Sequence, residues 1–211
     1  HVSLVEGKVF VSDVYEVENV DLSTGNIDFE GSVQVKGNVS SNFVIRAGGN
    51  VIISGVVEGA YIEAGGNIII ARGMNGMTKG ILKAGGNIVA KFLENSTASA
   101  GGYISTESIL HSNVTASTEI QVTGKRGFIT GGHVRAGQKI EVKTLGATLG
   151  APTVVEVGVD PEKKAEFMRT YDTSLIIVPT NESLKDEPDS LEISSDTLKN
   201  WINNNTAYVA D

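Results

Sequence analysis

Apolar and polar residues alternate in a short phrase that recurs six times between residues 45 and 142. Each copy is anchored by an alanine, and the intervals between successive anchors are 17, 20, 16, 16 and 20 residues. The anchors are Ala47, Ala64, Ala84, Ala100, Ala116 and Ala136. Self-similarity at such periods is typical of a solenoid, in which each unit buries its apolar face by stacking on the next.

The positions around each anchor form a column pattern. Mostly aliphatic residues stand two positions before the alanine and four and six positions after it, and the residue directly before it is polar in every copy. In the second copy these positions are Ile62, Ile68, Ile70 and Glu63. This alternation is the period of a half-buried strand. We therefore expect each repeat to form strand, corner and strand, with equivalent residues stacked about 4.8 Å apart in a parallel ladder.

Glycine pairs follow the anchor in the first four copies and mark the corner, since glycine adopts positive φ without a Cβ clash. They are Gly48, Gly49, Gly65, Gly66, Gly85, Gly86, Gly101 and Gly102. A phosphate-binding glycine loop needs a following helix and usually a Gly-Lys-Ser/Thr ending, and these copies have neither. Asn50, Asn67 and Asn87 share one column, which predicts an asparagine ladder bonded from coil to coil.

The coil lengths indicate the handedness of the helix. Val33, Val39, Ile45, Val51 and Val57 fall six residues apart, a spacing typical of left-handed hexapeptide acyltransferases. That register fails after Val57, and the later intervals are not multiples of six. The pattern therefore favours an all-β, right-handed parallel β-helix of about six to eight coils, with a small strand and helix appendage at the C-terminal end.

Composition narrows the chemistry. The 211-residue chain contains no cysteine, which excludes disulfides, thiolate metal sites and cysteine nucleophiles. Its formal charge of −8 argues against nucleic acid or an anionic membrane as the main partner. Neither a run of eighteen apolar residues nor a signal peptide is found, so we expect no membrane insertion and a cytoplasmic location. No motif calls for a cofactor.

Three regions are predicted along the chain. Residues 1–22 form a lead-in or cap, residues 23–160 form the solenoid, and residues 161–211 contain a helix start and an acidic tail. In that tail, residues 196–203 form a short amphipathic helix candidate that would dock on the solenoid as a cap. The solenoid itself carries two loops, predicted to project at residues 73–80 and 124–127.

Several non-repetitive phrases, together with the Ala-Gly-Gly-Asn copies, resemble one known family. They are Gly25-Asn26-Ile27-Asp28-Phe29, Lys91-Phe92-Leu93-Glu94-Asn95, Ile109-Leu110-His111-Ser112-Asn113-Val114, Lys143-Thr144-Leu145-Gly146 and Val155-Glu156-Val157-Gly158-Val159-Asp160-Pro161. Over residues 14–165 the chain resembles the β-solenoid domain of the flagellar assembly protein A family. The resemblance implies a cytoplasmic bacterial right-handed β-helix, linked in some members to flagellar assembly and polar organisation. It brings no catalytic residues, and the coiled coil that usually follows the last phrase is lost after Phe167.

A second likeness covers one coil. Residues 57–68 are similar to the C-terminal β-helix of the MinC division inhibitors, a domain that dimerises and binds protein partners.

Candidate chemistry is sparse. His111 and His133 fall on consecutive coils, but the spacing suggests no third metal ligand. We expect outward carboxylates to be solvated, and Lys125, Arg126 and His111 to be the candidate partner-binding residues. The favoured hypothesis is a non-enzymatic scaffold for protein partners, homo-oligomers included. The alternatives are an acyltransferase-like or carbohydrate-active β-helical enzyme and a self-assembling structural element.

Overall fold

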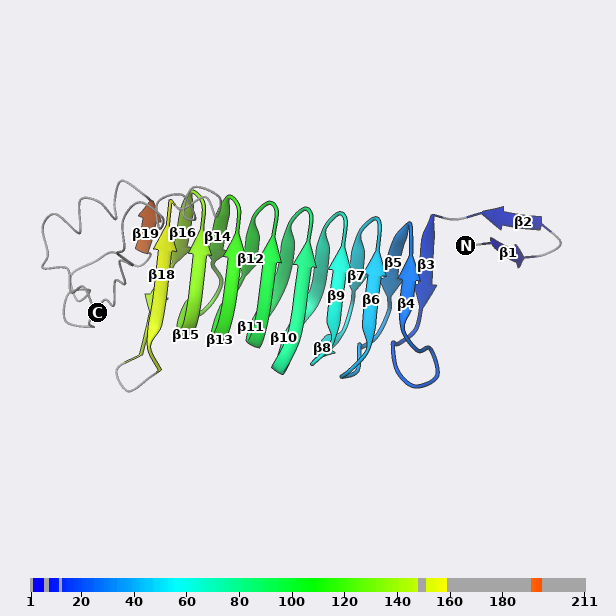
Figure 1. Ribbon diagram of the computed structural model, residues 1–211, viewed down its shortest axis with the longest axis horizontal. Coiled ribbons are helices and arrows are strands. Elements are labelled where there is room, and N and C mark those ends of the chain that lie inside the picture. Colours follow the sequence, from blue (N-terminus) through cyan, green and yellow to red (C-terminus); the bar gives the residue numbers. More distant parts are fainter. Residues whose placement is uncertain (1, 6–7, 12, 148–150, 159–190, 195–211) are drawn as a thin grey trace, which may run out of the picture.

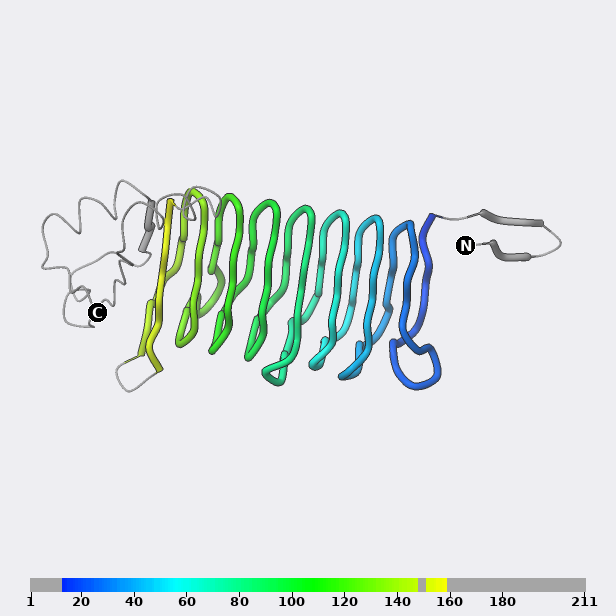
Figure 2. Tube along the Cα trace, viewed as in Figure 1, coloured from blue at the N-terminus to red at the C-terminus, as the bar shows by residue number. Residues whose placement is uncertain are grey.

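The computed structural model describes residues 2–5, 8–11, 13–147, 151–158 and 191–194. Every regular element in these ranges is a strand, and from Val14 onward the strands stack as an elongated series of coils (Figures 1 and 2). The chain rises along the near strands, crosses at the top, descends on the far side and advances toward the C-terminus (Figure 1). This winding is right-handed, and it confirms the predicted parallel β-helix.

Each coil contributes one segment to each of three parallel faces, and the register between neighbouring strands defines eight coils. Face A contains four whole strands, Ile27–Phe29 (β4), Val44–Ala47 (β6), Tyr61–Ala64 (β9) and Thr153–Val157 (β18). It also contains the C-terminal ends of four longer strands, which are Ile68–Ala84 (β10), Ile88–Ala100 (β11), Ser108–Ala116 (β13) and Phe128–Ala136 (β15). Face B contains Val14–Val17 (β3), Ser32–Val35 (β5), Val51–Ile53 (β7), the first residues of β10 and β11, Ile104–Thr106 (β12), Glu119–Val122 (β14) and Lys139–Val142 (β16). Face C contains bridges at Val20 and Val39, Val56–Glu58 (β8), the middle of β10 and β11, the first residues of β13 and β15, and Thr144–Leu145 (β17).

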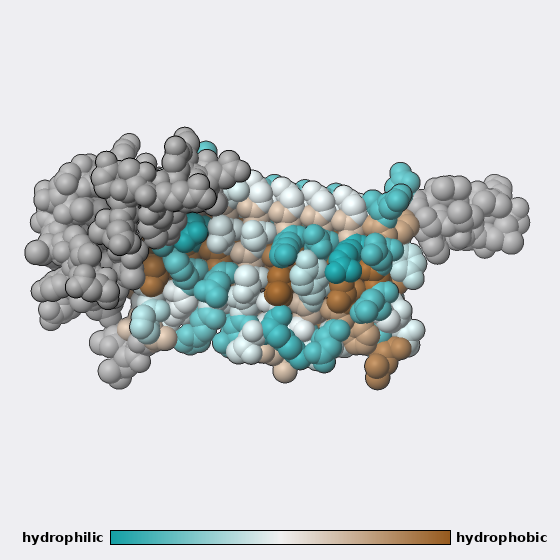
Figure 3. Space-filling view, in the orientation of Figure 1, coloured by the Kyte–Doolittle hydropathy of each residue, from teal (hydrophilic) through white to brown (hydrophobic). Residues whose placement is uncertain are grey.

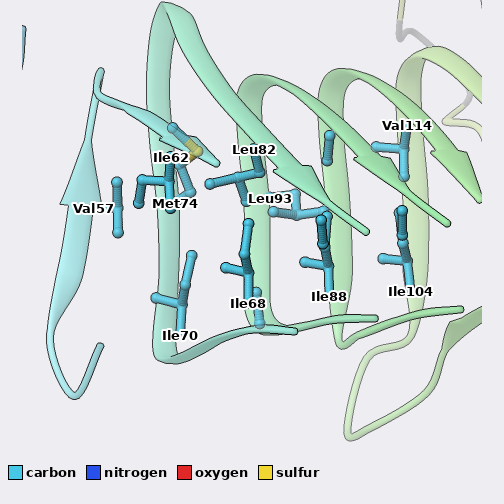
Figure 4. Close-up of a cluster of buried hydrophobic side chains, with 14 of the residues drawn as sticks. Val57, Ile62, Ile68, Ile70, Met74, Leu82, Ile88, Leu93, Ile104 and Val114 are labelled. Carbon is cyan, nitrogen blue, oxygen red and sulfur yellow. The ribbon is translucent and has the colours of Figure 1, made fainter. Parts of the chain in front are cut away.

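The core is a continuous pile of aliphatic side chains inside the stack (Figure 4). The predicted columns are its walls: Ile62 pairs with Leu82, Ile68 pairs with Ile88, and all four are fully buried. Burying one such side chain stabilises the fold by about 1.5–3 kcal/mol. The interior is narrow, because small alanines such as Ala64 occupy the column beside the glycine corners.

The parallel stack begins earlier in the chain than the sequence predicted. Val2–Val5 (β1) and Lys8–Val11 (β2) form an antiparallel hairpin, and parallel pairing begins at β3, before the predicted boundary at residue 23. The repeat signal misses this first coil because the residues before β3 and those between β4 and β5 lack the Ala-Gly-Gly phrase. At the other end, β18 confirms the predicted final strand. Leu191–Ser194 (β19) then pairs antiparallel with β16, whereas the helices predicted in residues 161–211 lie outside the described residues.

The loop predicted at residues 73–80 is only partly a loop. Gly73, Met74 and Asn75 pair on face C with both neighbouring coils, and the Met74 side chain is fully buried. A register shift falls between Asn75 and Gly80, and within it only residues 77–79 are exposed. The three glycines suggested a flexible bulge, but Met74 supplies the same inward position as Val57 and Leu93 in the adjacent coils.

Candidate functional site

Three kinds of corner join the faces, and we name each by the faces it connects. The AB corner holds the eight predicted corner glycines, between β6 and β7 and at the equivalent places in the next coils. None of these glycines has positive φ. They are required by stacking: a Cβ on Gly65 would overlap the carbonyl oxygen of Gly48, and a Cβ on Gly85 would overlap that of Gly65. The predicted position of the corner is correct, but the predicted reason for glycine there is wrong.

The asparagine column runs beside these glycines. The Asn67 amide N–H donates to Oδ1 of Asn50 at 2.7 Å, and the Asn87 amide N–H donates to Oδ1 of Asn67 at 2.8 Å. Tyr103 N–H completes the series by donating to Oδ1 of Asn87 at 2.9 Å. The hydrogen bonds therefore join side-chain oxygens to the backbone of the next coil, whereas the sequence suggested bonds between side-chain amides.

The CA corner is where the backbone becomes left-handed. All eight CA corners contain a residue with positive φ, and these residues are Gly25, Asn42, Gly59, Met77 and Thr78, Asn95, His111, Gly131 and Gly146. His111 has φ 46° and an exposed side chain whose ring lies against Gly131 of the next coil. The corner thus accounts for the conformation of His111 without a ligand.

The length of the BC corner differs between coils, and one of these corners is an extended loop. A single residue forms it at Lys91, Glu107 and Lys143, whereas residues 123–127 form an extended loop between β14 and β15. Lys125 and Arg126 lie exposed in this loop. The loop is held to the next coil, because Lys143 Nζ donates to the Gly124 carbonyl at 2.8 Å and the Lys143 and Thr144 amides donate to the Gly127 carbonyl.

An open groove of about 440 Å³ lies on face C beside this loop. The lining residues that sequence reasoning missed are Lys91, Phe92, Glu94, Glu107, Ser108, Leu110 and Phe128. Of the three candidate residues, Lys125 and Arg126 line the groove, whereas His111 is outside it, at the far end of the Ser108–Leu110 segment. The alternation within each strand could have identified the outward residues, but only the corner lengths reveal the loop beside them.

Most cations of the stack already have partners. In residues 13–147 and 151–158, seven of the eleven Lys and Arg side chains make an ion pair, a hydrogen bond or a ring contact. On face A, for example, Arg46 and Lys83 flank the Tyr61 ring at 5.6 and 5.5 Å. The other four of these eleven are Arg72, Lys91, Lys125 and Arg126, and the last three line the groove.

The second histidine, His133, contacts an acidic residue of the last coil. His133 Nε2 lies 3.0 Å from Glu156 Oε1, and Arg135 Nε donates to the other oxygen of Glu156 at 2.6 Å. These contacts join β15 to β18 and so hold the last coil of face A. Among the described residues, no cluster of three or more His, Asp or Glu side chains could hold a metal ion.

A family model described as the Flagellar Assembly Protein A beta solenoid domain matches residues 13–203. The chain belongs to this family. Comparison with curated proteins and with solved structures returns no match. The flagellar assembly protein A match begins one residue before β3, where the parallel stack begins, and includes β19. Within the part of the chain that the structure describes, no helix is long and apolar enough to cross a membrane.

Proposed function

We propose that this flagellar assembly protein A solenoid is a non-enzymatic scaffold that presents a rigid surface to protein partners in the bacterial cytoplasm. The observation that carries the proposal is the stack itself, in which eight coils repeat one register on three faces. Because backbone ladders join every coil to the next, and the asparagine column adds side-chain bonds in part of the stack, residues on different coils keep fixed spacings. A scaffold needs such fixed spacings to bind an extended partner.

The polar groups of the stack support this proposal over catalysis. Glu63 accepts a hydrogen bond from the Tyr61 hydroxyl at 2.9 Å and lies 3.5 Å from Arg46, so its carboxylate joins neighbouring strands. Glu156 joins two strands in the same way through Arg135. Carboxylates used in this manner stabilise the coil order.

The distribution of polar and apolar side chains on the surface also supports this proposal. Hydrophilic and intermediate side chains cover most of the face nearest the viewer, with separate apolar residues among them (Figure 3). A homo-oligomer remains part of the proposal, since the outward residues Ile52 and Ile69 are each more than a third exposed on adjacent coils of face B.

Flagellation of the native bacterium tests the proposal. Deletion of the gene should lower the number of flagella per cell, and the wild-type gene should restore it. The variant Ile68→Asp, which places a charge in the core, should fail to restore it. Unchanged flagellation on deletion would contradict a role in flagellar assembly, and turnover of acyl donors or glycans by the purified chain would contradict a non-enzymatic one.

A further inference from the structure

The four unpartnered cations follow one ridge of the solenoid. Arg72 and Lys91 occupy the BC corners of adjacent coils, because Ile70 pairs with Ala90 just before them and Gly73 pairs with Phe92 just after them. Lys125 and Arg126 lie in the BC loop two coils further on. Glu107 is the acidic residue between them, and its side chain packs against Gly124 of the loop. The ridge is therefore positively charged on a chain whose formal charge is −8.

A notch in the groove floor lies beside this ridge. The register places Phe92, Ser108 and Phe128 in one outward column on three consecutive coils. The Phe92 ring leans over Gly73 of the preceding coil, with its Cγ 2.7 Å from the place that a Cβ on Gly73 would take. The small Ser108 thus lies between two aromatic residues of this column, and the groove of about 440 Å³ that the three residues line has room for one apolar side chain.

The groove is formed before any partner arrives. Lys143 and Thr144 hold the BC loop through the Gly124 and Gly127 carbonyls, so Lys125 and Arg126 stand beside the notch without a closing motion. Such preorganisation lowers the entropic cost of binding.

The geometry points to this groove as a docking site for an extended acidic peptide segment of a protein partner, with one apolar side chain in the Ser108 notch. The inference rests on the proposed scaffold function and names the surface and the partner chemistry for it. The carboxylates of the peptide would lie along Lys91, Lys125 and Arg126. The apolar side chain would be covered by the rings of Phe92 and Phe128, where desolvation strengthens the neighbouring ion pairs.

Other anions fit the groove less well. Nucleic acid binding needs many more cations than the four on this ridge. A free phosphate would need converging backbone N–H donors, as at a helix N-terminus, and the described groove is made of strands and one loop. An acidic peptide matches both the spaced cations and the apolar notch.

Three synthetic peptides and fluorescence anisotropy test the inference. The first alternates Glu and Asp around a central Leu, the second replaces that Leu by Ser, and the third replaces the acids by Gln and Asn. The first should bind the full chain, the second should bind about tenfold more weakly, and the third should not bind measurably. Raising NaCl from 50 to 500 mM should weaken the first by more than about tenfold, because exposed charges are screened.

Matched variants locate the site. The double variant Lys125→Glu/Arg126→Glu should weaken the first peptide at least about tenfold. The control Lys79→Glu/Lys83→Glu makes the same change in net charge on other parts of the surface and should bind within about twofold of wild type. Ser108→Leu fills the notch and should remove the advantage of the Leu peptide over the Ser peptide. Its control is Ser105→Leu, an outward position on face B. Circular dichroism confirms that each variant is folded.

The inference is overturned if the first peptide does not bind, if it binds the double variant as tightly as wild type, or if a DNA oligonucleotide binds the ridge more tightly than the peptide. None of these results touches the proposed function, which depends on flagellation of the deletion strain. Loss of flagellation with an inactive groove would instead mean that the scaffold uses another face.

Discussion

The AB corner and the BC corner solve the same problem, the reversal of a chain between two flat faces, in opposite ways. The AB corner keeps its phrase through the first four copies, with glycines that the backbone of the neighbouring coil requires and asparagines that bond to the next coil. The BC corner changes from one residue at Lys91 to a five-residue loop at residues 123–127, and this loop carries unpartnered cations. Stacking dictates the AB corner in these copies. At the BC corner it dictates glycine only in the early coils, where Gly37 and Gly55 lie against the coil before them, and it leaves the later BC corners free to vary.

The CA corner sharpens the contrast. There the backbone adopts positive φ in every coil, yet the residues include Asn42, Asn95 and His111, whereas the AB glycines have ordinary φ. Asparagine and histidine are enriched in the left-handed region among non-glycine residues, so these positions tolerate side chains. In this solenoid, a glycine therefore indicates that the neighbouring coil leaves no room for a Cβ atom more reliably than it indicates a positive φ.

The largest expected effect comes from insertion. Adding Gly-Ser after Gly66 should displace the asparagine ladder and shift face B relative to face A. Loss of several ladder hydrogen bonds, each worth about 1 kcal/mol, should cost roughly 3–5 kcal/mol and lower the melting temperature by about 10 °C. The same insertion after Lys125 should cost less than about 1 kcal/mol, because loop length is inexpensive. Equal melting temperatures for the two insertions would remove the distinction between the corners.

Substitution of single glycines comes next. Gly65→Ala places a Cβ on the Gly48 carbonyl and should destabilise the fold by about 3 kcal/mol in urea unfolding. Gly25→Ala meets nothing within 4 Å, but has φ +75°, and should cost only about 1 kcal/mol. If Gly25→Ala proves the more costly of the two, conformational freedom and not stacking explains the glycines.

A smaller effect is expected in the asparagine column. Asn67→Ala removes the acceptor for the Asn87 amide and should cost about 1–2 kcal/mol. Asn67→Asp keeps an acceptor oxygen and should recover most of the loss, and Asn113→Ala, at an exposed outward position, should change the urea midpoint little. A full loss with Asp would show that the side-chain N–H₂ is the important group.

The smallest effect is a pH dependence of the first CA corner. Hydrogen bonds from the side chain and backbone of Ser23 hold the pKa of Asp21 below its ordinary value. Because the pKa of Asp21 is lower in the folded state, the ionised side chain stabilises the folded loop at pH values above the unfolded pKa of about 3.9. This stabilisation is lost as the pH falls through the folded pKa. NMR titration should show the lowered pKa in wild type and a rise toward the ordinary value in Ser23→Ala. An unchanged pKa in Ser23→Ala would contradict the assignment of the cause.

The sequence sufficed for the architecture because the stacked positions repeat. Ile62, Ile68 and the glycine pairs recur with their neighbours, so strands, corners and register could be predicted. Met74 was assigned to a loop because glycines surround it, and β3 was assigned to the lead-in because no Ala-Gly-Gly phrase precedes it. The groove could be predicted only in part: Lys125 and Arg126 stand out by charge, whereas Phe92, Ser108 and Phe128 come together only through pairing across coils.

The antiparallel direction of β19 bears on whether the solenoid can be extended by further parallel coils. A parallel coil offers the next chain the same evenly spaced donors and acceptors that it received, which is how fibrils extend. An antiparallel neighbour alternates narrow and wide pairs, so the edge beyond β16 is not a copy of the edges before it. β19 therefore ends face B with an edge on which a ninth parallel coil would not repeat the pairing of the first eight.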